Sequence, residues 1–144
     1  ELDDTQCPTG AFLSVEGSPF DFREMKKIGD GIHCDNAQLK LGGTYDHNFV
    51  INGDGLREAA VLQSNESGIR LTCFTDQPGV QLYVPRYTLH QKGIDGKDYP
   101  PYSAVCLETQ HYPNAINIEH FPSVVLKAGE NFRSKTLYHF SVMG

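Results

Sequence analysis

Short apolar runs of β character, separated by turns rich in glycine and proline, constrain the fold of this chain more than any other feature. Strand-like runs occupy residues 11–15, 47–52, 59–64, 68–75, 80–84, 104–110, 123–127 and 135–142. The third and fourth runs flank the triplet Asn-Glu-Ser, a connection that predicts a hairpin. Helical periodicity is almost missing, and two glycines soon end the best candidate, residues 22–27. Many short strands with few helices predict an all-β fold, an antiparallel sandwich or barrel.

Length and charge limit the partners of this chain. Its 144 residues suffice for one domain or for part of a larger one. The net charge is −6 and no run of Lys and Arg occurs, which argues against nucleic acid and against an anionic membrane surface. No apolar stretch approaches the roughly 20 residues of a membrane-spanning helix. We therefore expect neither a nucleic-acid nor a membrane partner.

The cysteines and histidines lack the spacing of metal or redox sites. The four cysteines are Cys7, Cys34, Cys73 and Cys106, and no two of them form a CxxC pair. We expect free thiols in a reducing compartment, which favours a cytoplasmic location. The six histidines show no compact ligand set such as HExxH, so no metal site is predicted.

Three of the predicted strands carry polar side chains on one face and apolar side chains on the other, because strand side chains alternate. The polar-face residues are Thr44, Asp46, Asn48, Gln81, Tyr83, Glu108 and Gln110. Sugars present many hydroxyls, which carboxylates and amides bind by paired donors and acceptors, so this set of side chains is typical of a sugar cleft. The alternative is a solvated face of an antiparallel sheet, on which Glu108 is simply exposed.

Four motifs and a final aromatic strand carry a family resemblance. They are GGTYDHNFVI, TDQPGVQLYV, VCLETQHYPNAIN and FPSVVLKAGE, in this order, followed by YHFSV. Together they closely resemble the C-terminal half of the aldose 1-epimerase (galactose mutarotase) family, and the resemblance extends over nearly the whole chain. It implies a large antiparallel β-sandwich. Residues 1–144 are then expected to be the C-terminal portion of this single domain, whose N-terminal half is absent from the chain.

The resemblance also implies an activity, the interconversion of the α and β anomers of free hexoses such as galactose and glucose. It assigns Glu108 as the catalytic base, and Asp46 and Gln81 as substrate-binding residues. In such a reaction a base removes the proton of the anomeric hydroxyl while an acid protonates the ring oxygen. The ring opens, the aldehyde rotates, and the steps reverse. No cofactor is required.

Two parts of the family pattern are missing or altered. The family's general acid is a histidine in a His-x-x-Phe-Asn motif of the N-terminal half, and no histidine here has that context. His47 is expected to be structural, because it faces away from Asp46, and His139 is expected to be a packed or satisfied histidine. His111 follows the base motif and is a candidate to touch the cleft. Arg86 stands where the family has a turn; it either fills that gap or is a surface charge.

Half of a closed sandwich would leave unpaired strand edges and an uncovered apolar face. We therefore expect the N-terminal half as a partner, either a separate polypeptide or a lost one, and we expect residues 1–144 to fold poorly alone. Two alternative functions stay open. One is a non-catalytic sugar-binding or regulatory protein of the same fold. The other is a glycoside hydrolase with Asp46 and Glu108 as its carboxylate pair.

Overall fold

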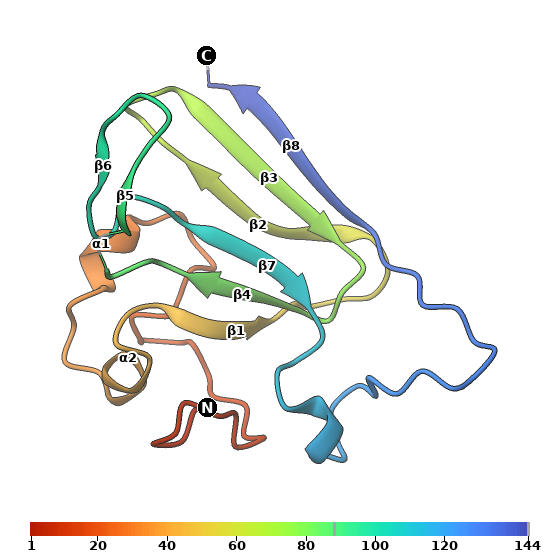
Figure 1. Ribbon diagram of the computed structural model, residues 1–144. Helices are drawn as coiled ribbons and strands as arrows, with labels where there is room; N and C mark the ends of the chain where they lie inside the picture. The colour runs from red at the N-terminus through yellow and green to blue at the C-terminus, as the bar shows by residue number, and fades with distance from the viewer. Residues whose placement is uncertain (88, 144) are drawn as a thin grey trace. The chain divides into compact units, whose positions relative to one another are not determined.

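A computed structural model describes residues 1–87 and 89–143, which form mostly strands (Figure 1). The helices are α1 (Ile28–Gly31) and α2 (Ala37–Gly42), and a 3₁₀ turn, η1, spans Ala115–Asn117. The strands are β1 (Asp46–Val50), β2 (Arg57–Gln63), β3 (Ile69–Thr75), β4 (Gly79–Tyr83), β5 (Leu89–Lys92), β6 (Asp98–Tyr99), β7 (Cys106–Gln110) and β8 (Thr136–Val142). No helix in the described part of the chain is long and apolar enough to cross a membrane.

The strands form three antiparallel sheets, in the orders β1-β4-β7, β2-β3-β8 and β5-β6. Two backbone hydrogen bonds show that β1 and β4 run in opposite directions. Val84 N–H donates to Tyr45 C=O at one end of the pair, and Ile51 N–H donates to Pro78 C=O at the other. The predicted all-β, antiparallel fold with few helices is confirmed.

The chain divides into two compact units. The first comprises Glu1–His47 and Leu82–Cys106, and the second comprises Asn48–Gln81 and Leu107–Gly144. Residues of β1, β4 and β7 are divided between the units.

In the second unit, β2 and β3 form the predicted hairpin. Their connection is closed by hydrogen bonds from Ser64 N–H to Ile69 C=O and from Gly68 N–H to Ser64 C=O. Gly68 has a φ of +71°, a conformation that favours glycine. β3 is the central strand of its sheet, and Cys73 on it is completely buried. Cys73 is therefore a core residue of this sheet.

β8 forms the edge of this sheet, paired with β3 from Ile69↔Val142 to Thr75↔Thr136 (Figure 1). Its apolar side chains are largely uncovered by the described residues, with Phe140 67% exposed and Val142 82% exposed. His139 is also exposed, so the described residues do not pack around it. The physical reason is that an edge strand packs only where a neighbouring element covers it.

Two other predicted strands do not form. Residues 11–15 and 123–127 have no strand hydrogen bonding, and both segments lie largely at the surface, with Val125 57% exposed. Apolar β-branched content alone does not make a strand, because a strand needs a partner in register.

In the first unit, α2 and the start of β1 build a small core. The Asn36 side chain caps α2 by accepting hydrogen bonds from Gln38 N–H and Leu39 N–H. Gly43 ends the helix in the left-handed conformation, with a φ of +70°. Tyr45 then enters the core fully buried, and its hydroxyl donates to Pro19 C=O.

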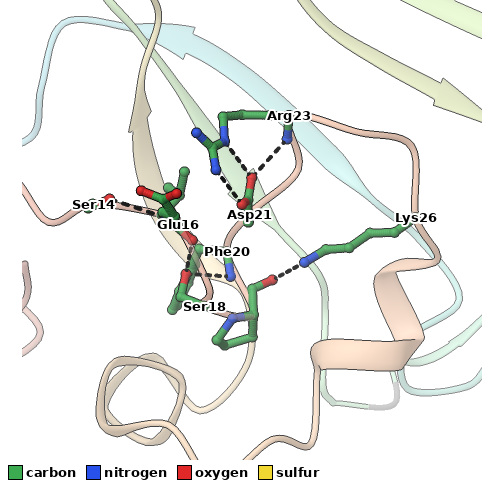
Figure 2. A network of polar contacts seen from close by, with 9 residues as sticks. Ser14, Glu16, Ser18, Phe20, Asp21, Arg23 and Lys26 are labelled. Atoms are coloured by element: carbon green, nitrogen blue, oxygen red, sulfur yellow. Dashed lines mark hydrogen bonds and ion pairs between the residues drawn. The ribbon is translucent and has the colours of Figure 1, made fainter.

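Residues 22–27, the best helical candidate in the sequence, form no helix, and Figure 2 shows the polar contacts they make instead. The Asp21 carboxylate accepts hydrogen bonds from the backbone N–H and from the guanidinium of Arg23. Lys26 reaches back and donates to Pro19 C=O, at 2.8 Å. Such side-chain hydrogen bonds compete with helical ones, and the helix begins only at Ile28.

Candidate functional site

Glu108 lies at the middle of β7 with an exposed side chain. Within residues 1–87 and 89–143, no hydrogen bond or ion pair involves its carboxylate. The neighbouring Thr109 faces β8, because its Oγ1 lies 2.6 Å from Thr136 Oγ1. The Tyr138 hydroxyl of β8 also donates to the backbone C=O of Leu107, at 2.7 Å. Because Thr109 faces β8 and strand side chains alternate, Glu108 points to the opposite face.

The interior face of β7 is held by a chain of threonine hydroxyls. Thr136 Oγ1 lies 3.1 Å from the hydroxyl of Thr75, which is completely buried at the end of β3. The pKa of the nearby Tyr138 phenol is raised, first by burial and then by the Cys73 thiol and the Glu108 carboxylate.

Gln81 and Gln110 lie on the Glu108 side of the sheet. Gln110 Nε2 donates to Gln81 Oε1 and to Asn48 Oδ1, each at 3.4 Å. Gln110 is two residues from Glu108 on β7, so these two side chains share a face. The predicted polar face therefore exists in the second unit, with one amide from each of β1, β4 and β7.

His111 is hydrogen-bonded to a residue that sequence reasoning missed, Gln77. The Gln77 amide is 5% exposed, and its Nε2 donates to Ser134 Oγ at 2.7 Å. Its Oε1 therefore accepts a hydrogen bond from His111 Nδ1, at 2.8 Å. Ser134 Oγ donates in turn to Asp76. The only sequence signal for Gln77 was its place in the TDQPG motif. That His111 touches a sugar cleft stays a prediction.

Asp46 and His47 begin β1 in the first unit, and His47 is structural, as predicted. His47 is buried, and its Nε2 lies 3.1 Å from Gln38 C=O. Its Nδ1 accepts from the backbone N–H of Asp46. Burial is the main cause that lowers the pKa of His47 to about 4, so the ring is neutral at pH 7. The α2 backbone fits this ring closely, because a Cβ at Gly42 would lie 2.7 Å from His47 Cε1.

Arg86 is an exposed residue that packs on its own unit. Its guanidinium lies 4.6 Å from the centre of the Tyr87 ring, and a Cβ at Gly43 would lie 2.5 Å from its Cζ. This contact with a glycine backbone fits the surface interpretation of Arg86. No group of three or more His, Cys, Asp or Glu side chains among the described residues is placed to hold a metal ion, and all four cysteines are free thiols.

A family model described as Aldose 1-epimerase matches residues 1–139. Galactose mutarotase from Bos taurus is 39% identical over 145 residues, which cover 98% of this chain and 40% of that protein. The human galactose mutarotase is 38% identical over the same share of each chain. Aldose 1-epimerase from Escherichia coli K12 is 30% identical over 143 residues, which cover 96% of this chain and 41% of that protein.

Two solved structures are similar to the chain over almost all of its length. An aldose epimerase homologue from C. elegans has a TM-score of 0.80 and 34% identity, covering 100% of this chain and 43% of that one. Galactose 1-epimerase from Lactobacillus acidophilus NCFM has a TM-score of 0.82 and 31% identity, covering 99% and 41%. The chain thus spans about 40% of the length of the curated relatives it matches.

Proposed function

The chain belongs to the aldose 1-epimerase family, and we propose that the native protein containing it interconverts the α and β anomers of free hexoses such as galactose and glucose. The observation that carries this proposal is the state of Glu108. Its carboxylate is exposed on the polar face of β7 and has no hydrogen bond or ion pair with any described residue. Such a carboxylate is open to accept a hydrogen bond from a ligand hydroxyl.

Glu108 acts as the general base on the anomeric hydroxyl. When the carboxylate accepts the proton of the hydroxyl on C1, the C1–O5 bond breaks, and a proton is delivered to the ring oxygen. The open aldehyde rotates about C1–C2 and presents its other face, and the reverse steps close the ring as the opposite anomer. A general base positioned in this way contributes about 10²–10⁴-fold to the rate.

Asp46 and Gln81 bind hydroxyls of the sugar and hold it in place for this transfer. A carboxylate accepts hydrogen bonds from hydroxyls, and an amide both donates and accepts, so each of these side chains suits a hydroxylated ligand. Holding the reacting atoms in place supplies a further part of the acceleration. No metal or cofactor takes part in this scheme.

The general acid is provided by a further polypeptide segment. The curated relatives are more than twice as long as the part of them that this chain matches. We propose that the N-terminal half of the sandwich, as the same or a separate chain, supplies the acid that protonates the ring oxygen. The exposed apolar edge strand β8 supports the need for such a covering partner.

Polarimetry of the native protein tests this function. Freshly dissolved α-D-galactose or α-D-glucose should reach its equilibrium rotation faster with protein than without it. Binding of the sugar without a faster change in rotation would instead support the alternative, a non-catalytic carbohydrate-binding or regulatory protein. Release of reducing sugar from a methyl glycoside would contradict both.

A further inference from the structure

We infer that Gln110 is a positioning residue that fixes the orientation of the Asn48 and Gln81 side-chain amides on the polar face beside Glu108. This inference deepens the proposed function and rests on it for the identity of the ligand, a hydroxylated sugar. The hydrogen-bond geometry on which it stands belongs entirely to the second unit.

Gln110 connects the whole width of its sheet. In the order β1-β4-β7, its own strand is separated from β1 by β4. Its single Nε2 nevertheless reaches Oδ1 of Asn48 on β1 and Oε1 of Gln81 on β4, at 3.4 Å each. The NH₂ group carries two hydrogens, so it can donate one to each of the two carbonyl oxygens.

Gly79 on β4 makes the contact with Asn48 possible. A Cβ at Gly79 would lie 2.6 Å from Asn48 Oδ1 and 2.8 Å from Asn48 Nδ2. It would also lie 3.0 Å from Cδ1 of Tyr112. Any side chain at this position would therefore push the Asn48 amide away. The missing Cβ lets the amide lie across β4 toward Gln110, with Tyr112 beside it.

The chemistry of the contact sets the polarity of the face. An amide group is planar, and its oxygen and nitrogen project from the carbonyl carbon in two different directions within that plane. Because Gln110 holds the oxygens of Asn48 and Gln81, both amides are turned with their NH₂ groups away from Gln110. The face then combines a carboxylate acceptor, Glu108, with oriented amide donors, an arrangement suited to a sugar whose hydroxyls both donate and accept.

Glutamate is the sharpest substitution at this position, because it keeps the shape of Gln110 and removes only its donors. In Gln110→Glu a carboxylate faces two carbonyl oxygens, so both amides are expected to turn over. The matched control is Gln63→Glu, the same chemical change at an exposed position at the end of β2. A second variant, Gly79→Ala, adds a Cβ that would displace the Asn48 amide, and it leaves Gln110 itself unchanged.

Two readouts on the native protein test the inference. In ¹⁵N spectra, the side-chain NH₂ signals of Asn48 and Gln81 should shift in Gln110→Glu and stay unchanged in Gln63→Glu. In Gly79→Ala, the Asn48 signal should shift. In polarimetric kinetics with galactose, Gln110→Glu should raise KM about tenfold or more and change kcat by less than about threefold, because binding is lost and the base is kept.

The possible outcomes separate this inference from the proposed function. Unchanged Asn48 and Gln81 signals in Gln110→Glu would overturn the inference, whatever the activity. A fall in kcat with an unchanged KM would also overturn it. If the native protein lacks mutarotase activity but the NH₂ signals shift as expected, the proposed function fails while the positioning role of Gln110 holds.

Discussion

The hydroxyl of Thr109 lies 2.6 Å from the hydroxyl of Thr136, and this contact turns one face of β7 toward β8. Thr136 also contacts the buried hydroxyl of Thr75, at 3.1 Å. Since side chains alternate along a strand, fixing Thr109 inward fixes Glu108 outward. The direction of the proposed base is therefore set by a threonine contact on the opposite face of its strand.

Substituting Thr136→Val should destabilise the native protein more than Thr109→Val, because Thr136 joins two hydroxyls and Thr109 only one. We expect a fall in the free energy of unfolding of about 0.5–1.5 kcal/mol for Thr109→Val and about 1–3 kcal/mol for Thr136→Val. Urea denaturation measures both. The control is Thr5→Val, which removes only a solvent-exposed hydrogen bond to Asp3 and is expected to change stability by less than about 0.5 kcal/mol. Equal losses at positions 109 and 136 would contradict this account of the threonine contacts.

His47 should make stability depend on pH below neutrality. Its pKa is lowered from the ordinary 6.5 to about 4 in the folded protein, first by burial. Between these two pKa values, the His47 side chain binds a proton in the unfolded chain and stays neutral in the folded chain. The stability is therefore full above pH 6.5 and is lost as the pH falls toward 4, by roughly 3 kcal/mol from this group.

The variant His47→Gln isolates this contribution, because it removes the titrating group while keeping a polar side chain next to Gln38. The difference in unfolding free energy between the native protein and the variant should shrink as the pH falls from 6.5 to 4. A difference that stays constant over this range would show that His47 has an ordinary pKa in the folded state.

Arg23→Gln should raise the pKa of Asp21. The hydrogen bond with the Arg23 side chain is the main cause that lowers the pKa of this carboxyl from 3.8 to about 2, and the charge of Lys26 is the smallest (Figure 2). NMR titration of the Asp21 side chain should therefore find a value close to 3.8 in Arg23→Gln and a still lowered value in Lys26→Ala. A larger rise in Lys26→Ala than in Arg23→Gln would contradict this assignment.

Alternation along strands predicted the polar face of this protein well. It placed the amides of Asn48, Gln81 and Gln110 on one face, and the hydrogen bonds of Gln110 to the other two show that they share it. The hairpin of β2 and β3 was equally predictable from the sequence, since the connection between the two strands is short and polar.

The contacts that come from distant parts of the chain were not predictable. The hydrogen bond between His111 and Gln77 joins residues far apart in sequence, and it depends on a register that no local pattern encodes. The run 123–127 has strand composition but no pairing partner among the described residues, so its composition was misleading. Local patterns indicate which face a residue takes, but strand order and register decide what it meets there.

Polarimetry of Glu108→Gln tests the central claim, that the Glu108 carboxylate is the base of a mutarotase, most directly. Glutamine keeps the shape of the side chain and cannot accept the anomeric proton as a carboxylate does. We predict that the variant of the native protein loses at least about 10²-fold in kcat for galactose while its KM changes little. Catalysis within a few-fold of the unsubstituted protein would contradict the claim.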